Sequence, residues 1–78
     1  MPVNASDVYF LVVNFQKMEN TTAQVVNVYY SEEDARSHYH ATLASNYTAK
    51  DTGALLGFSV ALLDKRCHHM ESESTGIN

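Results

Sequence analysis

The sequence predicts a small α+β domain in which an antiparallel-rich sheet packs on one helix. Three observations predict this fold. Two β-branched and aromatic segments are separated by a short polar loop, one long segment with helical spacing follows an acidic start, and a third apolar segment follows a glycine. The expected order is β-β-α-β with a short fourth edge strand. A chain of 78 residues makes one domain, which we place at residues 1–72, before an expected disordered tail at 73–78.

The first two segments predict a hairpin. Residues 8–15 (VYFLVVNF) are apolar on both faces, which predicts a central strand that is covered on both sides. The polar residues 16–22 predict the hairpin loop, and residues 23–30 (AQVVNVYY) predict the second strand.

Residues 31–49 predict the helix. Ser31 can cap its start, and the acidic residues 32–34 stand where the helix dipole favours negative charge. Helical spacing places one arc toward the core, made of Ala35, Tyr39, Leu43 and Tyr47. The opposite arc holds a row of small residues, Ser37, Ala41, Ala44 and Thr48. Small residues let a second helix approach closely, so we expect this row in an oligomer interface; an undecorated solvent surface is the alternative.

The second half of the chain completes the sheet. Gly53 can end the helix with a positive φ, residues 54–63 predict the third strand, 64–67 a turn and 68–72 the short fourth strand. The helix should cross over and return the third strand beside the first, giving the order 2-1-3 with the fourth strand at the edge. One helix covers one face only. The other face keeps apolar residues, so we expect a second copy or a partner protein to cover it, with contacts from Tyr9, Leu11 and Val13.

The composition excludes several function classes. The net charge is −4, and the basic residues are too scattered to form a phosphate-binding patch, so we expect no nucleic-acid partner. The apolar run 8–13 is too short for a transmembrane helix, so we expect no membrane partner. A lone cysteine and the lack of an apolar N-terminal segment predict a cytoplasmic protein. Because Cys67 cannot form an internal disulfide, a metal or oligomerisation would have to supplement the small core.

The segment 65–71 (KRCHHME) is the main candidate for metal chemistry, which needs three or four converging ligands. His38 and His40 are two residues apart on the helix and point to opposite sides, so they cannot share an ion. One of them at most could join Cys67 and His69, which share a face if their segment is extended. The spacing matches no familiar zinc motif. We therefore expect surface histidines and no cofactor, and keep a Cys67/His69 metal site as an alternative.

No catalytic constellation stands out. The histidines beside Cys67 in sequence would point to different sides of a strand, and no glycine-rich elbow precedes the thiol. Capping explains the carboxylates of residues 32–34, and the glycines at 53, 57 and 76 are isolated, so they form no phosphate loop. We therefore predict that the protein is not an enzyme.

These observations predict a small, non-enzymatic, homo-oligomeric binding protein that occupies a surface of a partner protein, as accessory or inhibitor proteins do. In size and style the chain resembles the short single-domain proteins of bacteriophages and other mobile elements; this likeness covers no motif and assigns no residue. A second hypothesis is an oligomer that sequesters a nucleotide-like anion, with contacts from Arg36, His40, Lys65 and Arg66. The third is the metal-binding protein described above.

Overall fold

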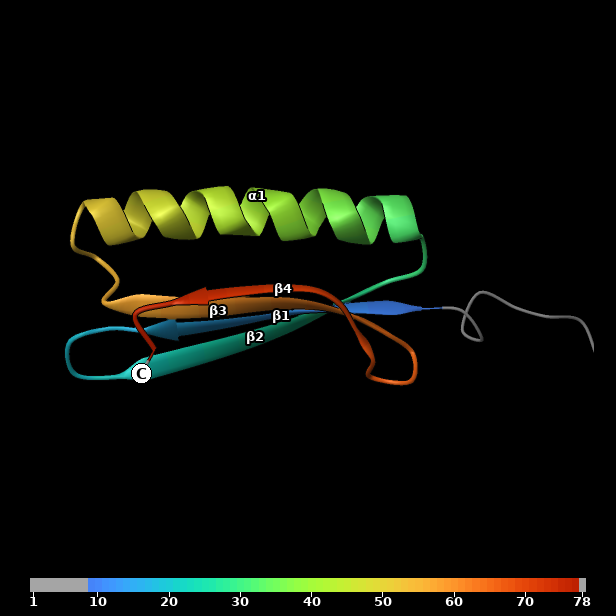
Figure 1. Ribbon diagram of the computed structural model, residues 1–78, viewed down its shortest axis with the longest axis horizontal. Helices are drawn as coiled ribbons and strands as arrows, with labels where there is room; N and C mark the ends of the chain where they lie inside the picture. Colours follow the sequence, from blue (N-terminus) through green and yellow to red (C-terminus); the bar gives the residue numbers. More distant parts are fainter. Residues whose placement is uncertain (1–8, 78) are drawn as a thin grey trace, which may run out of the picture.

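The structure is a computed structural model that describes residues 9–77. Along these residues the elements are β1 (Phe10–Lys17), β2 (Thr22–Tyr29), α1 (Glu32–Asp51), β3 (Gly57–Asp64) and β4 (His69–Thr75). The strands form one antiparallel sheet in the order β2-β1-β3-β4, and α1 lies along one face of it (Figure 1). The predicted α+β architecture is confirmed, including the return of the third strand beside the first and the edge position of the fourth.

Hydrogen bonds at both ends of α1 involve the residues that predicted where the helix begins and ends. The Ser31 hydroxyl accepts a hydrogen bond from the Asp34 N–H at 3.3 Å. At the other end Gly53 has φ 86°, its N–H donates to the Lys50 carbonyl, and the Ala54 N–H donates to the Ala49 carbonyl at 2.9 Å. This pair of bonds satisfies carbonyls that would otherwise lack partners at the helix end. No helix within residues 9–77 is long and apolar enough to cross a membrane.

Strand boundaries differ from the expected ones where pairing, not side-chain pattern, decides them. β1 continues to Lys17, because Gln16 and Lys17 pair with both neighbouring strands. Val8, the expected first residue, lies outside the described residues. β3 begins at Gly57, since residues 54–56 connect the helix to the sheet, and the Leu56 N–H already donates to the Lys17 carbonyl at 2.8 Å.

β4 is longer than the sequence predicted. Residues 73–75 lie in the strand, although the expected tail began at residue 73. Ser72 and Ser74 pair with Ala61 and Ser59 of β3. The Glu73 carboxylate also accepts a hydrogen bond from the Tyr47 hydroxyl of α1, which ties this end of β4 to the helix.

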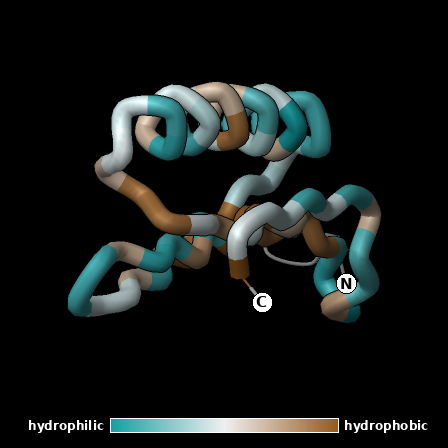
Figure 2. The backbone as a smooth tube through the Cα atoms, turned by 60° about the vertical axis from the view of Figure 1, so that its left-hand side comes forward, coloured by the Kyte–Doolittle hydropathy of each residue, from teal (hydrophilic) through white to brown (hydrophobic). Residues whose placement is uncertain are grey.

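The core lies between α1 and the two central strands. Val12, Phe58, Val60 and Leu62 of the sheet are fully buried against Ala35 and Tyr39 of the helix. Figure 2 shows that hydrophobic residues concentrate in the sheet, while the helix is mostly hydrophilic or intermediate. Tyr47 was expected in the core but is 41% exposed, although its ring packs edge-on against Phe58.

Candidate functional site

The sheet face that points away from α1 carries a compact group of apolar side chains. Val12 of β1 and Leu62, its pairing partner in β3, point toward the helix, so the neighbouring residues of each strand point to the other side. The register aligns them in rows across the strands: Val28–Leu11–Leu63, Val26–Val13–Ala61, and Phe15 in the third row. We call these seven residues the open face, because no element of residues 9–77 lies on that side (Figure 1).

The open face has an apolar centre and a polar border. Val26 and Val28 are each 49% exposed, whereas Ala61 and Leu63 are each 9% exposed. The residues in the same rows on β4 are His69 and Ser72. Lys17 is the only Lys, Arg, Asp or Glu among the described strand positions on this side. An uncharged apolar centre inside a polar rim is the usual anatomy of a protein–protein interface.

The structure separates the residues that the sequence predicted for an oligomer interface. Leu11 and Val13 belong to the open face, and Tyr9 lies at its end, where its hydroxyl donates to the Lys65 carbonyl at 3.2 Å. The small residues Ser37, Ala41, Ala44 and Thr48 are all exposed on α1, on the other side of the molecule. One twofold interface between two copies therefore cannot use both groups.

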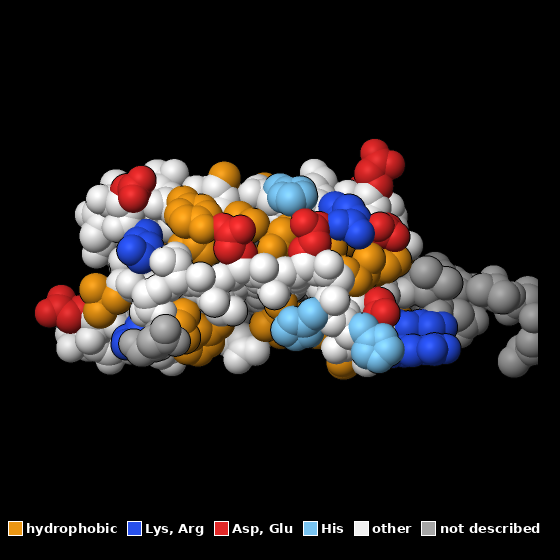
Figure 3. Space-filling view, viewed as in Figure 1, with side chains coloured by type: hydrophobic (Ala, Val, Ile, Leu, Met, Phe, Trp, Pro, Cys, Tyr) orange, Lys and Arg blue, Asp and Glu red, His pale blue; other side chains and the backbone are white. Residues whose placement is uncertain are grey.

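Arg36 and His40 lie at the boundary between α1 and β4, where acidic, basic and histidine side chains gather (Figure 3). The Arg36 guanidinium pairs with Glu32 at 2.8 Å and also with Glu71. The hydrogen bond that Arg36 donates to the Glu32 carboxylate is the main cause that raises the pKa of Arg36. His40 Nε2 lies 4.0 Å from the same Glu71 carboxylate. The positive charge of Arg36 is therefore already matched by carboxylates within the chain.

His38 lies on the other side of the helix from His40. Its ring packs against Tyr29 of β2 with centroids 5.1 Å apart, whereas His40 approaches β4. Since β2 and β4 form opposite edges of the sheet, these two histidines point to different sides of the helix, as their spacing predicted.

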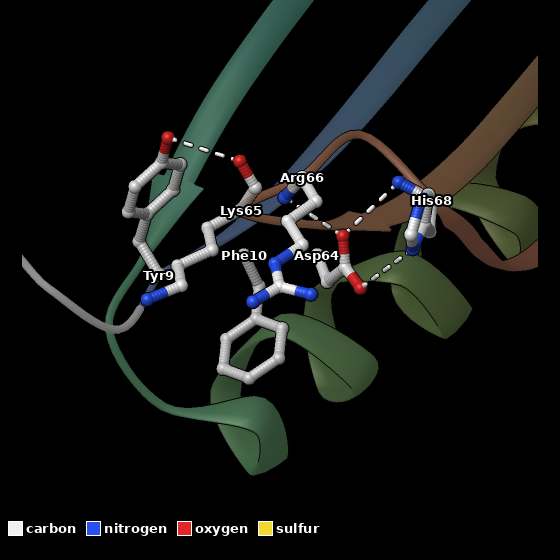
Figure 4. A pocket seen from close by; sticks show the side chains of 6 residues that line it. All are labelled: Tyr9, Phe10, Asp64, Lys65, Arg66 and His68. Carbon is white, nitrogen blue, oxygen red and sulfur yellow. Dashed lines mark hydrogen bonds and ion pairs between the residues drawn. The ribbon is translucent and has the colours of Figure 1, made fainter.

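The other two predicted anion contacts, Lys65 and Arg66, belong to the turn between β3 and β4. They line a hollow of about 280 Å³ together with Tyr9, Phe10, Asp64 and His68 (Figure 4). Arg36 and His40 do not line this hollow, so the predicted group of four is not brought together. Asp64 Oδ1 accepts hydrogen bonds from the backbone N–H groups of Arg66 at 2.8 Å and His68 at 3.0 Å. These two hydrogen bonds lower the pKa of Asp64, and the bond from the His68 N–H has the larger effect.

Cys67 occupies the same turn and is exposed. Its φ is 63° and its N–H donates to the Asp64 carbonyl, so the chain reverses at this residue. Cys67 and His69 were expected to share a face if their segment is extended, and this condition is not met: His69 is the first residue of β4 and pairs with Leu63. Within residues 9–77 no group of three or more His, Cys, Asp or Glu side chains could hold a metal ion.

Sequence reasoning missed a polar groove between α1 and β1. Asn46, on the helix, is 2% exposed and links two amides of β1. The Gln16 amide donates to Asn46 Oδ1 at 2.9 Å, and Asn46 Nδ2 donates to Asn14 Oδ1 at 2.9 Å. The groove has a volume of about 360 Å³. The available signal was that Asn14 and Asn46 interrupt segments whose inward positions are otherwise apolar.

Comparisons with known proteins assign no family to these features. No family model, curated protein or solved structure matches the chain.

Proposed function

We propose that the protein is a small, non-enzymatic binding protein that forms a homodimer by packing the open faces of two copies against each other. The observation that supports this proposal is the uncharged apolar centre of the open face, which no described element covers. A monomer seldom leaves such a contiguous patch in water, because burying apolar surface is favourable.

The size of the open face indicates how strong this association can be. The whole side of the sheet that carries the open face has four strands, which are spaced by about 4.8 Å and are seven or eight residues long at about 3.4 Å per residue, so its footprint is roughly 500 Å². Two copies would together cover roughly 1,000 Å², which is at the lower limit for a specific interface. We therefore expect a reversible dimer with a dissociation constant in the micromolar range rather than a permanent one.

The charge distribution is compatible with contact between two identical faces. Although each chain carries a net charge of −4, the described open-face side of the sheet has Lys17 as its only Lys, Arg, Asp or Glu. Repulsion between like charges is therefore not concentrated where the copies would meet. The dimer leaves the row of small residues on α1 accessible, namely Ser37, Ala41, Ala44 and Thr48. We propose that a partner protein binds there, as in an accessory or inhibitor protein.

Sedimentation equilibrium over about 1 to 200 µM tests the proposed dimer, because this range brackets a micromolar dissociation constant. We expect the average mass to rise from that of one chain toward that of two. A mass that stays at one chain throughout the range would contradict the proposal.

The second candidate is an oligomer that captures a small anion in the hollow beside the β3–β4 turn. Lys65, Arg66 and His68 line this hollow together with Tyr9, which favours a phosphate-bearing ligand such as a nucleotide. The Asp64 carboxylate opposes anion binding at the same place. Thermal denaturation with phosphate and with nucleotides tests this candidate, and an unchanged midpoint with all of them would count against it.

A further inference from the structure

The polar groove between α1 and β1 has properties that the dimer does not explain. It lies on the helix side of the sheet, opposite the open face, and extends toward β2. Its volume of about 360 Å³ falls within the range of small-molecule sites. All but one of the side chains that line it carry hydrogen-bonding groups, the exception being Ala41.

The floor of the groove is a chain of three amides from Gln16, Asn46 and Asn14. Both linking hydrogen bonds are 2.9 Å long, and Asn46 is buried between the other two. Amides joined head to tail leave a carbonyl acceptor at one end and an NH₂ donor at the other. The groove therefore presents an acceptor and a donor, held in place by a buried partner, at neighbouring positions.

The wall of the groove is one stripe of α1. His38, Thr42 and Ser45 are spaced by four and three residues, so they lie on the same side of the helix. The hydroxyls of Thr42 and Ser45 have no hydrogen-bond partner among residues 9–77, in contrast to Thr48, whose hydroxyl donates to the Ala44 carbonyl. The His38 ring rests against Tyr29 and adds an aromatic surface at one end.

Packing alone does not account for this choice of residues. An apolar side chain at position 46 would fill the same space without the desolvation that the buried Asn46 amide incurs, and the half-buried Asn14 and Gln16 are its hydrogen-bond partners. The groove also contains no Lys, Arg, Asp or Glu. We propose that it binds an uncharged ligand with adjacent hydrogen-bond donors and acceptors, of the size of a monosaccharide or a nucleobase.

The test uses the complete chain labelled with ¹⁵N, because the side-chain amides of Asn14, Gln16 and Asn46 give their own NMR signals. One arm titrates glucose and galactose, and the other titrates adenosine, cytidine and uridine. We expect saturable shifts of these amide signals with at least one compound, at a dissociation constant of about 1 mM or below. The arm that responds identifies the source of the ligand chemistry.

A pair of variants links the binding to the groove. Thr42→Val with Ser45→Ala removes both free hydroxyls, and we expect it to weaken binding by about tenfold or more. Ser37→Ala with Thr48→Val makes the same two changes on the outer side of α1 and should leave the affinity unchanged. Absence of amide shifts with every compound at about 10 mM, or equal weakening by both variants, would overturn the proposal.

Discussion

Replacing Val26 and Val28 by threonine should dissociate the proposed dimer without unfolding the sheet. Threonine has nearly the shape of valine and an equally high strand propensity, so β2 should keep its pairing with β1. The change places a hydroxyl where the interface would otherwise bury a methyl group.

The magnitude follows from the exposure of the two valines. Each is 49% exposed, so in a dimer threonine forgoes about half of the ~0.8 kcal/mol that a buried methyl contributes and incurs about half of the ~1–3 kcal/mol for desolvating a hydroxyl, or about 1 kcal/mol in all. Two valines in each of two copies then account for about 4 kcal/mol. This corresponds to a dissociation constant raised roughly 1,000-fold, so a micromolar dimer would become monomeric across the accessible concentrations.

Val25→Thr provides a matched control. Val25 is also 49% exposed and lies in the same strand, but it pairs with Asn14 in the row that faces the helix. Sedimentation equilibrium should show an unchanged dissociation constant for this variant. If the double variant at Val26 and Val28 changes the constant by less than about threefold, packing through the open face is wrong.

The remaining predictions concern stability. Gly57→Ala should lower the free energy of unfolding in urea by about 2 kcal/mol or more, because a Cβ there would lie 2.3 Å from the Gly76 carbonyl oxygen. Gly53→Ala should lower it by only about 1 kcal/mol, because its Cβ would meet nothing within 4 Å and only the φ of 86° opposes it. Equal losses of stability in the two variants would contradict the clash at Gly57. Burial, with nearby glutamates, raises the pKa of Tyr39, so its hydroxyl ionises at a lower pH in the unfolded chain than in the folded one. The free energy of unfolding should therefore hold up to about pH 10 and then fall, and a Tyr39→Phe variant should lose less stability above that pH. Hydrogen bonds lower the pKa of Asp64. Its contribution to stability should be present above about pH 4 and lost as the pH falls through the lowered pKa, so Asp64→Asn should flatten the acid side of a plot of stability against pH. An unchanged acid side would refute this role.

The fold could be predicted because its main signals are local. The apolar run in β1, the Ser31 cap and the glycine after α1 each depend on a few neighbouring residues. β4 was underestimated because it contains one large apolar residue, Met70, and its length is set by pairing with β3. The turn at residues 64–67 was predicted, but the positive φ of Cys67 was not, since a positive φ at a residue other than glycine follows from the hydrogen bonds around Asp64.

The open face was predictable in outline, whereas the polar groove was not. Strand alternation places Leu11 and Val13 on one side once one helix is seen to cover the other. The groove depends on three amides that are far apart in sequence and meet only through the fold. Asn46 falls within the inward arc of α1, but a polar residue there is informative only when its partners on β1 are known.

The two edges of the sheet differ in a way that bears on how copies associate. β4 carries Glu71 and Glu73, and charged residues of this kind discourage pairing with another strand. β2 carries no charged residue and no proline, so its free edge could pair with a second β2. In that arrangement Val25 and Val26 would both lie next to the new strand, and threonine at either position would weaken the dimer.

Edge pairing would leave the apolar residues of the central strand without an explanation. Leu11, Val13 and Phe15 belong to β1, which already has β2 on one side and β3 on the other, so a strand added beyond β2 would not cover them. Packing of face against face covers all three. The Val25 control therefore distinguishes the two arrangements: an unchanged dissociation constant supports the open face, and a loss equal to that of Val26→Thr alone would indicate pairing through the β2 edge.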